Sequence, residues 1–209
     1  MISKLHYITP EQHNDYVSLI EEVCESGINW VQLRIKNASK EEIIAIGKSV
    51  LPICKQYNVP LIINDSVEIC QAIDADGVHL GQSDGSLIEA RKVLGAKKII
   101  GATVNTFAHI QQVASSECVD YCGLGPYRWT SSKQNLNPIL GQEGVMSFFS
   151  MCRLHQINIP TVVIGGITPS DVKNILQAGA HGVAVISAIH QAENKQEIIQ
   201  QFYNEIASV

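Results

Sequence analysis

Short runs of consecutive apolar residues alternate along the chain with longer segments whose apolar positions recur every three or four residues. Unbroken Val, Ile and Leu runs are typical of parallel strands that are buried on both faces. They predict strands at Leu5–Thr9, Trp30–Ile35, Pro60–Asn64, Gly77–Leu80, Lys98–Thr103, Tyr121–Gly125, Thr161–Ile164 and Gly182–Ser187. The segments between them predict helices, among others at Asp15–Ser26, Lys40–Tyr57, Ser66–Ile73, Ser86–Leu94 and Asp171–Ala178.

Helix start signals support this pattern. Ser39 precedes Glu42 with capping-box spacing, and Pro169 after Thr168 suits a first helical turn. Eight strands alternating with helices form either an open doubly wound sheet or a closed (β/α)8 barrel. The number of strands, their even spacing and the lack of a Gly-x-Gly-x-x-Gly turn after the first strand favour the barrel. We therefore expect an α/β protein with a single TIM-barrel catalytic domain over residues 1–209.

Composition narrows the class of protein. The chain has 209 residues, 45% of them hydrophobic, and a formal net charge of −5. This charge argues against nucleic-acid or membrane partners bound through a global basic field. No apolar run approaches roughly 18 residues and no leader opens the chain, so a cytoplasmic location is expected. The six scattered cysteines read as reduced core residues, and Cys118 with Cys122 has no second pair to complete a zinc site.

Function in a barrel collects where the strands end. Gln32, Arg34 and Lys36 alternate, so they should face one side of their strand. Two cations at one pocket mouth need an anionic partner. That partner is either a bound anion or, in the alternative, acids of the barrel in structural ion pairs.

Two carboxylates follow neighbouring strands. Asp65 follows Pro60–Asn64, and Asp84 follows Gly77–Leu80 after a short polar stretch. Mg²⁺ takes few protein carboxylates and completes its shell with water and phosphate oxygens. Each aspartate could instead cap the helix that follows it. Their position beside Arg34 and Lys36 favours a metal and diphosphate site.

Two further segments suggest phosphate binding. The polar loop after Tyr121–Gly125 offers the hydroxyls of Thr130 and Ser132 and the cation of Lys133, although it could be a plain surface loop. Gly165 and Gly166, together with a short helix expected after the last strand, fit the phosphate site common in barrels.

The histidines are less informative. His79 lies beside the candidate metal acid and is either a hydrogen-bonded barrel histidine or a substrate contact. The others are expected to face solvent or to be incidental; they are His6, His13, His109, His155, His181 and His190. No Ser-His-Asp or Cys-His set can be assembled, so the residues predict diphosphate handling without a covalent nucleophile.

Five motifs occur in order along the chain: Gln32-Leu33-Arg34-x-Lys36, Ile63-Asn64-Asp65, Asp76 to Asp84, Gly125-Pro126 with Thr130-x-Ser132-Lys133, and Ile164-Gly165-Gly166-Ile167. Together they resemble the thiamine-phosphate synthase (thiamine-phosphate pyrophosphorylase) family over essentially the whole chain. Members of that family join a hydroxymethylpyrimidine diphosphate to a thiazole phosphate, releasing diphosphate and giving thiamine phosphate.

The resemblance implies a role for each matching position. Small-molecule substrates and Mg²⁺ as cofactor are implied, and a homo-oligomer is left open. Arg34, Lys36, Asn64 and Lys133 would bind the diphosphate, with Arg34, Lys36 and Lys133 acting in catalysis, and Asp65 and Asp84 would hold Mg²⁺. Gln32 and Thr103 would contact the pyrimidine, and the thiazole phosphate site would comprise Thr130, Ser132, Gly166, Ile186 and Ser187.

The chain departs from the family pattern at four places. Thr103 replaces serine and Ser132 replaces threonine, which keeps both hydroxyls. Asn105 stands where histidine is common, and Arg128-Trp129 replaces a smaller pair, which affects the expected pocket shape. The alternatives are a thiazole tautomerase-like paralogue, a non-catalytic regulatory barrel, and another phosphate-handling barrel enzyme such as one from tryptophan biosynthesis.

Overall fold

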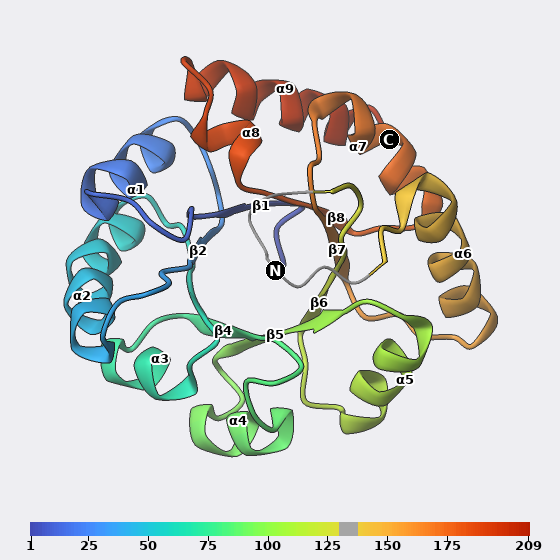
Figure 1. Ribbon diagram of the computed structural model, residues 1–209, viewed down its shortest axis with the longest axis horizontal. Helices are drawn as coiled ribbons and strands as arrows, with labels where there is room; N and C mark the ends of the chain where they lie inside the picture. The colour runs from blue at the N-terminus through green and yellow to red at the C-terminus, as the bar shows by residue number, and fades with distance from the viewer. Residues whose placement is uncertain (130–137) are drawn as a thin grey trace.

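The strands form one closed parallel barrel in the order β1 to β8, with helices around the outside (Figure 1). The computed structural model describes residues 1–129 and 138–209. The predicted (β/α)8 fold is confirmed. The strands are β1 (Leu5–Ile8), β2 (Val31–Leu33), β3 (Leu61–Asn64), β4 (Gly77–Leu80), β5 (Ile99–Val104), β6 (Tyr121–Leu124), β7 (Thr161–Ile164) and β8 (Gly182–Val185). The helices are α1 (Tyr16–Glu25), α2 (Lys40–Gln56), α3 (Val67–Ile73), α4 (Leu87–Leu94), α5 (Phe107–Ser116), α6 (Gly141–Leu154), α7 (Pro169–Ala178), α8 (Ser187–His190) and α9 (Lys195–Ala207).

Two apolar cores hold the barrel together. Leu5 and Tyr7 on β1 belong to the outer core, which packs between the strands and the helices. Ile8 belongs to a smaller cluster with residues of other strands, and this cluster fills the barrel interior. Because successive side chains of a strand point to opposite faces, a strand such as β1 contributes to both cores. The inner cluster comprises Ile8, Trp30, Ile62, Tyr121, Val162 and Ala184.

Helix ends follow the start signals in the sequence. Ser39 and Glu42 make both hydrogen bonds of a capping box at the start of α2. Thr168 and Asp171 do the same for α7, with Pro169 in its first turn. Most predicted bounds shift by one or two residues: β2 spans Val31–Leu33, α7 begins at Pro169, and β8 ends at Val185 because Ser187 already opens α8.

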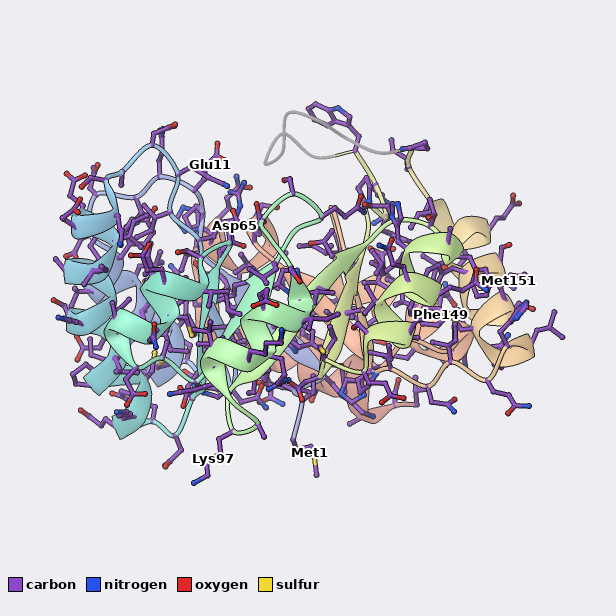
Figure 2. The ribbon with its side chains drawn as sticks, turned by 90° about the horizontal axis from the view of Figure 1, so that it is seen from below. Met1, Glu11, Asp65, Lys97, Phe149 and Met151 are labelled. Carbon is purple, nitrogen blue, oxygen red and sulfur yellow. The ribbon has the colours of Figure 1, made fainter. Side chains whose placement is uncertain are left out.

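The two ends of the barrel differ. Asp65, which follows β3, lies with Glu11 at one end, whereas Met1 and Lys97 lie at the opposite end (Figure 2). The candidate chemistry is therefore at the end where the strands terminate. All six cysteines are free thiols and five are buried, which confirms them as reduced, mostly core residues. Within the described ranges, no helix has the length and apolar character needed to cross a bilayer.

Candidate active site

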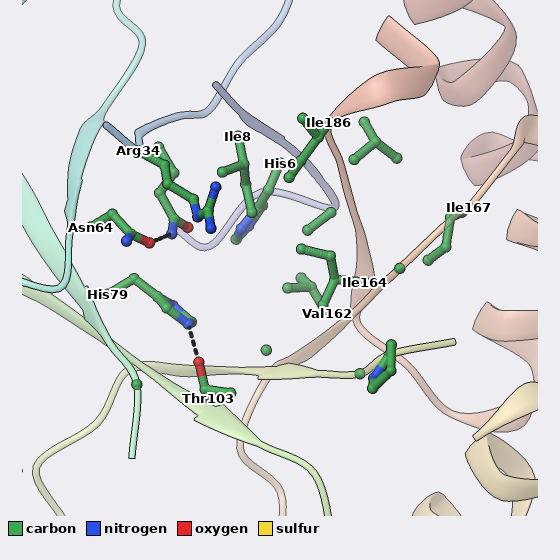
Figure 3. Close-up of a pocket in the computed structure, with 18 of the residues that line it drawn as sticks. His6, Ile8, Arg34, Asn64, His79, Thr103, Val162, Ile164, Ile167 and Ile186 are labelled. Atoms are coloured by element: carbon green, nitrogen blue, oxygen red, sulfur yellow. Dashed lines mark hydrogen bonds between the residues drawn. The ribbon is translucent and has the colours of Figure 1, made fainter. Parts of the chain in front are cut away.

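A cavity of about 360 Å³ opens at the end of the barrel where the strands terminate (Figure 3). Every predicted site residue in the described part of the chain lines it. These are Gln32, Arg34, Lys36, Asn64, Asp65, Asp84, Thr103, Gly166, Ile186 and Ser187. Thr130, Ser132 and Lys133 lie outside the described residues.

The two cations after β2 are held at the cavity wall by specific contacts. The backbone N–H of Arg34 donates to the hydroxyl of Thr9 at 2.8 Å. The Arg34 guanidinium lies 3.1 Å from Glu11 Oε2, and Lys36 Nζ lies 2.6 Å from Asp65 Oδ2. Both cations thus have carboxylate partners, as the ion-pair alternative predicts. Glu11 and Asp65 are 42% and 31% exposed, so phosphate oxygens can compete for the cations from the cavity.

The helix-cap interpretation of the two aspartates is wrong. Ser66 and Ser86 are the N-caps of α3 and α4, and their hydroxyls accept from Ile69 N and Glu89 N. Capping needs the side chain directly before the first helical residue, and the serines occupy that position. Both carboxylates are therefore left at the cavity wall.

Asp65 and Asp84 are close enough to affect each other. Burial and the neighbouring Asp65 carboxylate raise the pKa of Asp84 above its usual range. The Oδ2 atom of Asp84 accepts a hydrogen bond from Gly81 N at 2.7 Å, which fixes the side chain. Two nearby carboxylates repel each other unless a cation or a proton lies between them.

This pair of oxygen ligands fits Mg²⁺ only as part of a larger shell. Among the described residues there is no group of three or more His, Cys, Asp or Glu side chains that could hold a metal. Two carboxylates are sufficient for Mg²⁺, which keeps several waters and binds substrate phosphates. A dication between Asp65 and Asp84 would also relieve the repulsion that raises the pKa of Asp84.

The cavity floor carries two hydrogen-bonded sets. Gln32 Nε2 donates to Asn64 Oδ1 at 2.7 Å. His79 lies 3.0 Å from both the Tyr121 hydroxyl and the Thr103 hydroxyl, and Figure 3 shows its ring directed at Thr103. His79 is therefore a hydrogen-bonded barrel histidine that also lines the cavity.

His6 corrects an expectation. It is 1% exposed rather than facing solvent, stacks on Trp30 with ring centroids 4.2 Å apart, and lines the cavity. Burial lowers its pKa to about 3, so its ring is neutral. The alternation of β1 carried the missed signal, since His6 shares the inward face with Ile8.

The other side of the cavity is apolar. Val162, Ile164, Ile167 and Ile186 lie opposite Arg34 and Asn64 in Figure 3. The β7 loop beside them needs glycine at two positions. A Cβ on Gly165 (φ 115°) would lie 2.8 Å from Tyr127 N, and one on Gly166 (φ 63°) would lie 3.1 Å from Arg128 Cβ.

Asn105 and Arg128, two of the departures from the family pattern, connect loops at the cavity rim. Asn105 accepts from Gln82 Nε2 at 2.7 Å and donates to Gly125 O at 2.6 Å. The guanidinium of Arg128 makes two 2.5 Å contacts with the Asp171 carboxylate and donates to Gly166 O at 3.0 Å. Trp129 is 68% exposed.

Arg128→Ala is expected to lower the free energy of unfolding at neutral pH by about 1–2 kcal/mol, because it leaves the 8% exposed Asp171 side chain without its cation. Arg128 is 48% exposed, so the loss stays below that of a fully buried pair. Burial works against ionisation of Asp171, yet hydrogen bonds from Arg128 and Thr168 hold its pKa below 3.8. The carboxylate thus stabilises the fold above that pH and ceases to do so as pH falls through its native pKa.

Urea unfolding of wild type and Arg128→Ala at neutral pH and well below pH 3.8 measures this effect. The difference between the two proteins should shrink at the lower pH. Lys173 is exposed and lies on α7, as Asp171 does, so Lys173→Ala controls for loss of one positive charge. An unchanged difference at both pH values would show that the pair does not stabilise the fold through Asp171.

Comparisons with known proteins show the family of the chain. A family model described as "Thiamine monophosphate synthase" matches residues 5–189. A thiamine-phosphate synthase of Flavobacterium johnsoniae is 40% identical over 202 residues, covering 96% of this chain and 95% of the relative. One from Bacteroides fragilis is 39% identical over 201 residues, covering 96% and 98%. The solved thiamine phosphate pyrophosphorylase from Pyrococcus furiosus is 30% identical with a TM-score of 0.84, covering 98% of this chain and 96% of that structure.

Proposed function

Because the chain belongs to the thiamine monophosphate synthase family, we propose that it condenses hydroxymethylpyrimidine diphosphate with a thiazole phosphate, giving thiamine phosphate and diphosphate. The observation that carries this proposal is the division of one cavity into two walls. Arg34 and Asn64 lie on one side of the cavity, and Ile164, Ile167 and Ile186 lie on the other (Figure 3). Lys36, Asp65 and Asp84 line the same cavity and are close to one another. A charged diphosphate and a largely apolar ring with its own phosphate need these two environments.

The reaction breaks the bond between the pyrimidine methylene carbon and the diphosphate oxygen. The amino group of the pyrimidine donates electron density toward that carbon, so the diphosphate can leave with the bonding pair before the thiazole nitrogen attacks. The new carbon–nitrogen bond leaves the positive charge on the thiazolium product. Such a step needs stabilisation of the leaving group more than it needs a base or a nucleophile.

Arg34 and Lys36 would supply that stabilisation. As diphosphate enters, its oxygens would replace Glu11 and Asp65 as their partners, and Asn64 would donate its side-chain N–H groups. Lys133 would add a further cation. Asp65 and Asp84 would hold Mg²⁺, which when bound supplies additional positive charge at the phosphate oxygens. The apolar wall would keep water away from the reactive methylene carbon.

The proposal requires two separate phosphate sites, which calorimetric titration tests. Arg34→Ala should weaken diphosphate binding in the presence of Mg²⁺ by about tenfold to a hundredfold, the range for lost hydrogen bonds to a charged group. Thiazole phosphate binding should change less than about twofold, because that ligand would lie at Gly166 and Ser187. Ser187→Ala is the matched reciprocal variant and should weaken thiazole phosphate alone.

If Arg34→Ala lowers the affinity for both ligands equally, the two ligands share one phosphate site, and the two-substrate proposal fails. A wild-type protein that binds thiazole phosphate but no diphosphate, even with Mg²⁺, would instead be a tautomerase-like paralogue.

A further inference from the structure

Three side chains from neighbouring strands form a continuous hydrogen-bonded chain beneath the cavity. Tyr121 on β6 contacts His79 Nδ1, and His79 Nε2 contacts Thr103 on β5, both at 3.0 Å. Gly101 makes room for this contact, because a Cβ there would lie 2.3 Å from Tyr121 Cζ and 2.5 Å from His79 Nδ1. The absence of a side chain at Gly101 on β5 therefore allows the rings of Tyr121 and His79 to approach each other.

The partner within reach of the Tyr121 hydroxyl indicates the direction of these hydrogen bonds. Tyr121 is 1% exposed, and burial raises the pKa of its hydroxyl far above the usual value, so the phenol keeps its proton. Within the described ranges, His79 Nδ1 is the acceptor this hydroxyl reaches. A buried phenol O–H without an acceptor is costly, so we assign the Tyr121 hydroxyl as donor to Nδ1 and the imidazole proton to Nε2, which then donates to Thr103 Oγ1. Thr103 in turn has its own hydroxyl hydrogen to donate into the cavity.

Gln32 presents the opposite polarity. Its Nε2 donates to Asn64 Oδ1, which leaves the carbonyl Oε1 of this cavity-lining side chain to act as the acceptor. The side chain is buried, so an acceptor left without a donor there is costly. The cavity floor thus offers Gln32 as an acceptor and Thr103 as a donor. Asn64 fixes the first role and His79 fixes the second.

We propose that Tyr121 and His79 are positioning residues that fix Thr103 as a donor, so that with Gln32 the cavity selects an aminopyrimidine over its oxo counterpart. An amino group beside an unprotonated ring nitrogen presents a donor next to an acceptor. The oxo form presents the reverse, a carbonyl oxygen next to a ring N–H. Sites that hydrogen-bond a substrate group discriminate far more strongly than apolar pockets do. This inference rests on the proposed function and specifies which pyrimidines that site accepts.

Binding of the two pyrimidine monophosphates, which lack the diphosphate leaving group, tests the selection without turnover. By calorimetry, wild type should bind the amino form at least about a hundredfold more tightly than the oxo form. Tyr121→Phe and Thr103→Val should each lower affinity for the amino form about tenfold, while thiazole phosphate binding stays unchanged. Thr103→Ser keeps the hydroxyl and should therefore bind the amino form with an affinity near that of wild type. Tyr7→Phe is the matched control, because the Tyr7 hydroxyl is buried in the outer core without a hydrogen-bond partner within the described ranges.

Two further readouts separate a relay from a merely structural effect. The Tyr121→Phe, Thr103→Val double variant should lose no more than either single variant, since both act through one hydroxyl. In ¹⁵N NMR of wild type, the His79 signals, identified by their loss in His79→Gln, should place the ring proton on Nε2. Additive losses, or a proton on Nδ1, would overturn the relay. If wild type makes thiamine phosphate but Tyr121→Phe binds the amino form normally, this inference fails while the proposed function stands.

Discussion

Replacing Asp65 or Asp84 with alanine is expected to lower the rate of thiamine phosphate formation by at least about a hundredfold, the scale of losing a group that stabilises transition-state charge. Each change removes one of the two carboxylates that would hold Mg²⁺ at the cavity wall. Neither residue caps a helix, because Ser66 and Ser86 do so. The melting temperature should therefore stay near that of wild type. Steady-state rates at saturating Mg²⁺, together with circular dichroism melts, measure both effects.

The matched controls are the adjacent caps. Ser66→Ala and Ser86→Ala should each cost about 1 kcal/mol of stability, a shift of a few degrees in melting temperature, with activity per folded molecule retained. Activity that survives both aspartate changes and chelation of divalent cations would show that the metal assignment is wrong. If the aspartate variants have melting temperatures lowered as much as those of the serine variants and remain active, Asp65 and Asp84 have a structural role only.

Lys133→Ala is expected to lower kcat by about a hundredfold while changing KM for thiazole phosphate by less than about threefold. Lys133 lies outside the described residues, and this role follows from the family pattern that the chain matches. A cation on the leaving diphosphate interacts most strongly as negative charge develops, so its loss falls on kcat.

Lys92→Ala, on the exposed face of α4, controls for removal of a lysine without contact to the cavity. A rise in KM with kcat intact would show that Lys133 binds the ground state and the transition state equally. Steady-state kinetics with each substrate varied in turn distinguish the two outcomes.

The barrel was predictable because its signals are local. Most of the buried parallel strands are predominantly apolar runs, and most helix starts carry a capping side chain, as at Ser39 and Thr168. The alternation of Gln32, Arg34 and Lys36 placed them at one cavity for the same reason. The same alternation of side chains along β1 would also have placed His6 inside the barrel.

Other features depend on contacts between residues far apart in sequence. The Arg128 to Asp171 pair joins the segment after β6 to the first turn of α7, and the sequence shows only an arginine where the family has a smaller residue. The Tyr121, His79 and Thr103 chain exists because β4, β5 and β6 pair in one register, in which His79 is opposite Gly101 and Gly101 opposite Tyr121. The choice between aspartate and serine caps likewise required the observed helix starts.

We propose that this cavity joins two substrates by breaking the carbon–oxygen bond that links the pyrimidine methylene to diphosphate. The most direct test of this proposal is a time course that follows thiamine phosphate and released diphosphate together in purified wild-type protein. The two products should appear in equal amounts, and only when the pyrimidine diphosphate, the thiazole phosphate and Mg²⁺ are all present. Tight binding of thiazole phosphate with no thiamine phosphate formed under these conditions would contradict the account.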